Sequence, residues 1–322
     1  MKIFFILLIT TVAYNLNVMA QDSRVATLQH GSNIQAFYGE NALSAAHEAA
    51  EDGDIITLSA GEFYGMNVTK VITLRGEGTE KTHIKSRITF TIPEKSTRTL
   101  LLEGLHISFS AYNGGDCVSI SGSDGTEKAV VSKCYISVYG ANEELGFENC
   151  NGTVIQSHLD GAIGAFTGSH VTCLNSIFGF PSCEGNGKFD VESCFIYPSY
   201  SYQLQYVHYS TIKNSIIRTN SPAFDNTNTF SHCLTAGNIA IPVSEFGWTL
   251  PDVWNAWDGI VDDKYHLTEE PAATYIGTDG TEIGIYGGMY PFDLTPSYPL
   301  VKTLDVVGSH KNGKLNVKIN VK

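Results

Sequence analysis

Aromatic side chains crowd into one short stretch of the chain, between residues 195 and 209. Four tyrosines fall within ten residues there, more than a core needs. Flat rings that end in a hydroxyl group can stack on a sugar face and hydrogen-bond to its hydroxyls, which is the chemistry of glycan binding. The candidate ligand-binding residues are Phe195, Tyr197, Tyr200, Tyr202, Tyr206 and Tyr209.

Carboxylates are the other side chains that could take part in catalysis or metal binding. Hydrolysis of a glycosidic bond needs a pair of them, because one protonates the leaving oxygen while the other activates water. Asp116 has no such partner beside it, and we interpret it as a turn residue. Asp258, Asp262 and Asp263 lack the spacing of a calcium-binding loop. Phosphate-binding loops, nucleophile elbows and zinc-protease motifs do not occur either, so we assign no catalytic residue, no metal and no cofactor.

The elements that position these side chains follow from a repeat. The pattern apolar-x-x-[Cys/Ser]-x-apolar recurs between residues 131 and 235 as VSKCYI, VIQSHL, CLNSIF, VESCFI, IKNSII and FSHCLT. A period near twenty residues is typical of a solenoid, because a unit this short cannot bury its own apolar face and stacking has to supply the core. We therefore predict an all-β fold, a parallel β-helix, with Leu102 opening the first unit of the repeat.

Within a unit, side chains alternate inward and outward around a corner, which in VESCFI is Ser193. Asparagine suits a corner because it tolerates left-handed backbone. The corner residues are Lys133, Gln156, Asn175, Ser193, Asn214 and His232.

The slot after each corner is expected to be small and buried. Cysteine and serine alternate there, which favours packed thiols over disulfides. The slot holds Cys134, Ser157, Ser176, Cys194, Ser215 and Cys233. We therefore predict that the seven cysteines are mostly free and buried.

The next slot points outward and yet is mainly apolar. It holds Tyr135, His158, Ile177, Phe195, Ile216 and Leu234. One interpretation is a seam covered by the C-terminal segment or a neighbouring subunit, which the branched aliphatic residues favour. The other is an open glycan platform, which the tyrosine-rich stretch favours.

The two ends are expected to be capped, because open coils expose strand edges. Residues 21–51 form the N-terminal cap, with a helix over 41–54 that begins at Asn41 and turns His47 toward solvent. Residues 52–245 form the β-helix. Residues 246–322 form a C-terminal β extension that packs back on the β-helix, at least over the last coils of the β-helix.

Within that extension we expect Trp248, Trp254 or Trp257 to touch residues such as Ile216 or Leu234. Residues 301–307 and the alternating strand at the C-terminus are expected to pair across the turn GSHKNG.

Charge and the N-terminus limit partners and location. With 20 basic and 33 acidic residues, the net charge of −13 argues against nucleic acid or an anionic membrane as partner. Residues 1–20 have the charged start, short apolar run and small-residue end of a signal peptide, cleaved near Ala20/Gln21. We expect an exported protein, in the periplasm, at the cell surface or outside the cell, with no transmembrane segment.

The repeat resembles the right-handed parallel β-helix of the pectin-lyase-like superfamily, over roughly residues 52–240. This resemblance implies three short strands per coil. The stretch GGDCVSISG (114–122) is similar to part of the Asp-Asp-Cys-Val-x-Ile motif of polygalacturonases, but Gly115 replaces one aspartate and the His-Gly and Arg-Ile-Lys motifs have no match. GTEIGIYGG (280–288), taken with the helical cap and the repeat, resembles uncharacterised Bacteroidetes proteins of this fold.

Three functions remain open. The favoured one is a non-catalytic exported or cell-surface protein that binds a glycan. The first alternative is a polysaccharide lyase or glycoside hydrolase acting on an uncommon polysaccharide, although only Lys188 is basic between residues 134 and 212. The second alternative is a structural or adhesin-like module.

Overall fold

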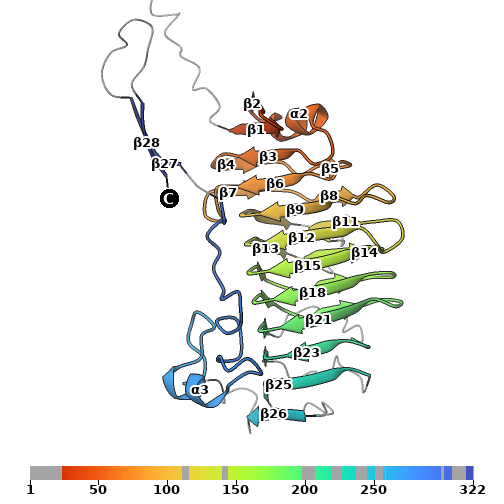
Figure 1. The fold of residues 1–322 in the computed structure, drawn as a ribbon, viewed down its shortest axis with the longest axis vertical. Coiled ribbons are helices and arrows are strands. Elements are labelled where there is room, and N and C mark those ends of the chain that lie inside the picture. Colours follow the sequence, from red (N-terminus) through yellow and green to blue (C-terminus); the bar gives the residue numbers. More distant parts are fainter. Residues whose placement is uncertain are drawn as a thin grey trace, which may run out of the picture.

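The backbone winds into stacked coils of short parallel strands, as the ribbon of the computed structural model shows (Figure 1). The structure describes residues 24–110, 116–139, 144–197, 207–218, 227–236, 245–250, 257, 259–298, 301–306 and 317–321. Parallel pairing between successive coils, with three strands in a typical coil, makes the fold a right-handed parallel β-helix, as predicted.

Each coil contributes a strand to the first face, before the corner. These strands are β3 (Ile55–Leu58), β6 (Thr73–Gly76), β9 (Thr99–Glu103), β12 (Lys128–Ser132), β15 (Asn151–Ile155), β18 (His170–Leu174), β21 (Lys188–Glu192), β23 (Thr211–Lys213), β25 (Thr229–Ala236) and β26 (Glu245–Leu250). The sequence places the end of the β-helix at residue 245, whereas β26 continues the parallel pairing to Leu250.

The second face follows the corner and the third closes the coil. The second-face strands are β4 (Gly61–Phe63), β7 (Thr82–Ile84), β10 (His106–Ser110), β13 (Tyr135–Tyr139), β16 (His158–Leu159), β19 (Ile177–Phe178), β22 (Phe195–Ile196) and β24 (Ile216–Ile217). The third-face strands are β5 (Asn67–Val68), β8 (Ile88–Thr91), β11 (Val118–Ser121), β14 (Leu145–Glu148), β17 (Ile163–Ala165) and β20 (Pro181–Cys183).

The pairing register is the one that the repeat predicts. Val131 lies between Leu102 and Val154. Further along, Val191 lies between Cys173 and Ile212. The inward side chains of all three faces form one continuous apolar core along the solenoid.

The predicted corner residues have the predicted left-handed backbone. Their φ angles are 52° at Lys133, 48° at Gln156, 43° at Asn175, 53° at Ser193, 51° at Asn214 and 51° at His232. A positive φ at so many non-glycine positions is uncommon, and here it is imposed by the same sharp bend in every coil.

The slot after the corner shows why cysteine and serine interchange. The Ser157 hydroxyl donates to the Ile155 carbonyl at 3.0 Å and accepts the N–H of Cys134, one coil earlier, at 3.2 Å. In the same slot the Cys194 thiol donates to the Glu192 carbonyl. All seven cysteines are buried and none forms a disulfide bond, as predicted.

The N-terminal cap is a hairpin and a short helix. Strands β1 (Val25–His30) and β2 (Asn33–Tyr38) pair antiparallel, and β1 also pairs antiparallel with β3. Helix α2 covers Ala42–Ala49, shorter than the predicted 41–54, because Ala50 already has extended backbone.

His47 corrects another expectation, because it is buried and does not face solvent. Its Nε2 accepts the N–H of Thr69 at 3.2 Å, and its carbonyl accepts from Lys70 Nζ. The face of α2 that carries His47 therefore packs on the loop before β6.

After β26 the chain turns back and covers the outward face of the last coils. Trp257, Leu267, Ile283 and Ile285 form a second buried cluster with Ile177, Phe195, Ile216 and Leu234. The short helix α3 (Glu269–Thr274) lies in this layer. Trp257 and Ile216 thus share one cluster, which is the kind of contact expected from the sequence, whereas Trp254 lies outside the described residues.

Residues 277–298, which we call the strap, then run along the corners toward the N-terminal coils (Figure 1). Asn214 exchanges two hydrogen bonds with Thr278, and Asn175 Nδ2 donates to the carbonyls of Ile285 and Gly287. Farther along, Gln156 donates to Pro291 O, Lys133 to Asp293 O, and the Ser297 N–H donates to Glu103. The corner side chains therefore hold the strap as well as shaping the coils.

The expected C-terminal hairpin is present. Strand β27 (Val301–Val306) pairs antiparallel with β28 (Val317–Val321). None of the helices in the described part has the length and apolar run that a membrane span requires.

Candidate functional site

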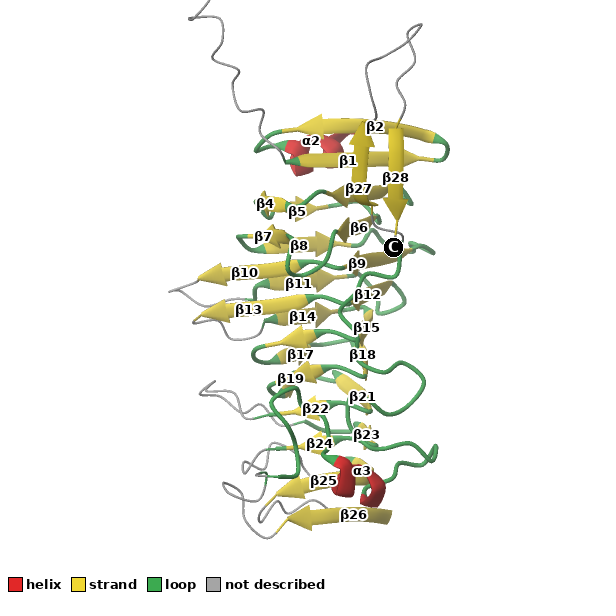
Figure 2. Cartoon of the chain, turned by 90° about the vertical axis from the view of Figure 1, so that its left-hand side faces the viewer, coloured by secondary structure: helices red, strands yellow, loops and turns green. Residues whose placement is uncertain are grey.

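A row of aromatic rings stands on the outward face of the second-face strands β7, β10, β13 and β16, of which the first three are labelled in Figure 2. Parallel pairing places one ring per coil: His83, His106, Tyr135 and His158, which we call the ring row. Successive ring centroids are 4.5, 4.7 and 5.2 Å apart. All four side chains are partly exposed.

The same slot is covered in the later coils. Ile177 is 1% exposed, and Phe195, Ile216 and Leu234 are 0% exposed, because the C-terminal layer packs on them. The outward row therefore has an open half, made of rings that can titrate or hydrogen-bond, and a closed half that is apolar.

Asp160 ties two rings of the open half together. The Tyr135 hydroxyl donates to Asp160 Oδ2 at 2.5 Å. His158 Nε2 lies 3.4 Å from Asp160 Oδ1, with the side chains 20% and 41% exposed respectively. A half-exposed carboxylate thus lies at the end of the ring row, where it can accept hydrogen bonds from hydroxyl groups.

Glu144 lies buried next to this carboxylate. Burial, and after it the negative charge of Asp160, raise the pKa of its carboxyl to about 8. The backbone N–H groups of Gly161 and Val138 act in the opposite direction. Gly161 is required for this approach, because a Cβ at that position would stand 2.7 Å from Glu144 Oε1. At neutral pH the site therefore holds a protonated acid beside a carboxylate.

Two of the three imidazoles in the row, those of His106 and His158, favour the neutral form. Burial lowers the pKa of His106, and the nearby His83 lowers it further. Burial also lowers the pKa of His158, although the charge of Asp160 opposes this. Neutral imidazole has one donor and one acceptor nitrogen, which is the combination that suits hydroxyl ligands.

Three buried polar atoms at this site have no hydrogen-bond partner among the described residues. They are His106 Nε2, His158 Nε2 and Glu144 Oε2. His158 Nε2 nevertheless keeps its ion-pair contact with Asp160 Oδ1 at 3.4 Å. All three atoms are covered by protein, and buried polar atoms are almost always paired, so enclosed water is the partner that would complete them.

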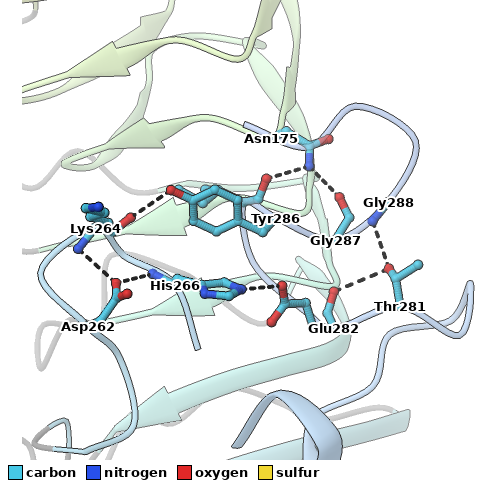
Figure 3. A network of polar contacts seen from close by, with 10 residues as sticks. Asn175, Asp262, Lys264, His266, Thr281, Glu282, Tyr286, Gly287 and Gly288 are labelled. Carbon is cyan, nitrogen blue, oxygen red and sulfur yellow. Dashed lines mark hydrogen bonds and ion pairs between the residues drawn. The ribbon is translucent and has the colours of Figure 1, made fainter. Parts of the chain in front are cut away.

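A ring from the C-terminal layer closes one end of the row. The Tyr265 centroid is 5.8 Å from that of His158, 4.9 Å from that of Phe195 and 6.4 Å from that of Tyr197. The turn that carries Tyr265 is drawn in Figure 3, where Asp262 Oδ1 accepts the N–H groups of Lys264 and His266 at 2.8 and 2.9 Å.

The tyrosine-rich stretch predicted from the sequence is only partly described. Tyr197 is partly buried, and its hydroxyl donates to Leu159 O at 2.8 Å. Phe195 cannot offer its ring to a ligand, because it is 0% exposed beneath the C-terminal layer. Tyr209 is 71% exposed, away from the ring row. Tyr200, Tyr202 and Tyr206 lie outside the described residues.

Sequence reasoning missed five residues of the site, which are His83, His106, Glu144, Asp160 and Tyr265. His106 occupies the outward slot of the unit that begins at Leu102, so extending that slot backward by one unit would have found it. His83 occupies the same slot one coil earlier. Glu144 lies outside the repeat positions, and the sequence carries no signal for it.

The acidic residues considered from the sequence do not join this site. Asp262 caps its own turn, and the N–H groups of His266 and Lys264 lower its pKa. The Asp116 carboxyl packs against Gly146, where a Cβ would collide with it. Asp258 lies outside the described residues. Across the described part of the chain, no cluster of three His, Cys, Asp or Glu residues is arranged to hold a metal ion.

The chain was compared with protein-family models, with curated proteins and with solved structures. No protein-family model matches the chain, and no curated protein matches it in sequence. Among solved structures it is similar to a mutant of the PL6 family alginate lyase AlyGC, with 11% identical residues and a TM-score of 0.24. The matched part covers 78% of this chain and spans 58% of the lyase chain. This similarity concerns the backbone and says nothing of activity.

Proposed function

We propose that this chain is an exported protein that binds a glycan along the ring row. The observation that carries the proposal is the open half of the outward row, where four rings stay accessible while the C-terminal layer buries the other half. Sugar rings pack on aromatic and imidazole edges, and their hydroxyls pair with a half-exposed carboxylate such as Asp160.

The test is a panel of soluble polysaccharides scored for binding and for new reducing ends. The double variant His106→Ala/Tyr135→Ala should weaken binding at least about tenfold, which corresponds to about 1.4 kcal/mol. Tyr209→Ala is the matched control, because its ring is 71% exposed and lies outside the row. Loss of binding in the control alone would move the site to the tyrosine-rich stretch.

A second candidate is cleavage of a polysaccharide, by hydrolysis or elimination. It is favoured by Glu144 and Asp160, since a protonated acid beside a carboxylate is the combination that acid–base cleavage needs. New reducing ends that disappear in both Glu144→Gln and Asp160→Asn would establish it. Binding without new ends would leave a glycan-binding protein, and absence of both would favour the structural or adhesin-like module.

Export stays a prediction from residues 1–20, which lie outside the described part of the chain. The resemblance to Bacteroidetes proteins also stays a prediction. N-terminal sequencing of the protein recovered from its host should give Gln21 as the first residue. A chain that still begins at Met1 would contradict it.

A further inference from the structure

The ring row ends at a step in the surface. Up to His158 the rings are partly exposed, whereas the next residue in the same slot, Ile177, is already 1% exposed. In Figures 1 and 2 the loops around α3 lie outside the later coils, while none of the described segments forms such a layer over β10 and β13. A ligand that follows the row toward the later coils therefore meets a wall.

Tyr265 forms the face of that wall. Its ring centroid is 5.8 Å from that of His158, and the two ring planes meet at 81°. Behind it are Phe195, in edge contact at 61°, and Tyr197, nearly parallel to it at 27°. Tyr265 is partly buried against the C-terminal cluster and keeps part of its surface exposed.

The backbone holds Tyr265 in an unusual conformation. Its φ is +64°, which is rare for a bulky side chain and is stable only where the surroundings impose it. Here the Tyr265 N–H donates to Asp262 O, and the Asp262 carboxylate accepts the N–H groups on either side of Tyr265.

Two further contacts support the same turn, as Figure 3 shows. The Tyr286 hydroxyl donates to Lys264 O at 3.2 Å. His266 pairs with Glu282 at 2.9 Å, and this links the turn to the strap, which Asn175 fixes to the solenoid. The wall is thus a fixed part of the surface and not a loose loop.

We propose that Tyr265 is an end stop, so that the site takes the terminal residues of a polysaccharide and not its interior. This inference rests on the proposed glycan binding. A chain continuing past His158 would have to pass through Tyr265 and the layer behind it. A chain that ends there packs its last sugar against Tyr265, with Asp160 placed to accept the extra hydroxyl that only a chain end has.

The test varies the number of chain ends at constant polymer mass. Xylan, laminarin, alginate and polygalacturonate are used intact and after partial acid hydrolysis to tenfold more reducing ends, and the protein bound per milligram is measured at saturation. End binding predicts that capacity on the recognised polymer rises in proportion to the ends. Capacity that stays constant or falls overturns the end stop and leaves the proposed function standing. Failure of every polymer to bind overturns both.

The variant Tyr265→Gly removes the ring and suits the positive φ, so it avoids the strain that alanine would keep. Its capacity on intact polymer should rise severalfold and lose the dependence on ends. Tyr290→Ala is the control, because Tyr290 is 44% exposed on the strap. A Tyr265→Gly protein that keeps wild-type dependence on ends overturns the role of Tyr265. The wild-type measurement decides end binding even if this variant fails to fold.

Discussion

Tyr135 on β13 and Asp160 beyond β16 are joined across neighbouring coils by a hydrogen bond of 2.5 Å. Burial raises the pKa of Tyr135, and the hydrogen bond to Asp160 raises it further. The hydroxyl therefore remains a donor at any physiological pH. This bond gives the open half of the outward row a polar partner, which the apolar half, at Ile177 and Ile216, does not need beneath its cover.

All seven cysteines should react as free thiols once the protein is unfolded. In the native protein they should be nearly inert to thiol reagents, because burial raises the pKa of the Cys134 and Cys194 thiols to about 12. Thiol counts in denaturant with and without reductant should be equal. A count that rises by six on reduction would mean three disulfides and would contradict the packing described for Cys134 and Ser157.

Val191→Asp should destabilise the protein by several kcal/mol, because a charge would enter the apolar core where Val191 is 1% exposed. Glu192→Ala should change the free energy of unfolding by about 0.5 kcal/mol, since Glu192 faces outward and its pair with Lys213 is half exposed. Denaturant unfolding measures both. Equal midpoints for the two variants would refute the inward and outward assignment.

The solenoid was predictable because its constraint repeats. Each unit requires an inward apolar residue, a left-handed corner and a small buried side chain. Val191, Asn175 and Ser157 are examples of these three positions, and the same residue types recur in every coil of the repeat. Capping elements do not repeat. Nothing in the sequence of α2 tells whether His47 meets solvent or the N–H of Thr69, which comes from a distant loop.

The site was only half predictable for the same reason. Tyr135 and His158 lie in the repeat slot and were found, but their exposure depends on where the C-terminal layer stops. Asp160 and Glu144 become neighbours because loops of two different coils converge there, and the raised pKa of Glu144 comes from burial that no local sequence pattern encodes. Tyr265 reaches the row from a segment far along the chain.

Asn175→Gly should loosen the strap. Glycine accepts the φ of 43°, so the change removes only the amide that donates to Ile285 O and Gly287 O. Gly287 O then loses its buried partner, which costs about 1–3 kcal/mol, whereas Ile285 O still accepts the N–H of Phe292. Gln156→Gly is the matched control, because it also has a positive φ and its bond to Pro291 O is solvent-exposed. Urea unfolding that shows equal losses for the two variants would contradict an anchoring role for Asn175.

Glu144 should make stability fall as pH rises. The pKa of its carboxyl is about 8 in the folded protein, against the ordinary value of 4.5 in the unfolded chain. The native state therefore keeps a proton that the unfolded chain releases. The stabilisation is complete below pH 4.5 and is lost as the pH rises to about 8, at about 1.4 kcal/mol per unit of pKa difference. Glu144→Gln has no proton to lose, and its stability relative to the wild type should therefore increase between pH 5 and pH 9. His106 and His158 titrate in both proteins, so their contribution cancels in the difference.

The control is Glu148→Gln, a change at an exposed position of the same coil, whose stability should follow that of the wild type at every pH. If the difference between wild type and Glu144→Gln is the same at both pH values, then Glu144 is already ionised in the folded protein and the site holds two carboxylates instead of an acid and a carboxylate.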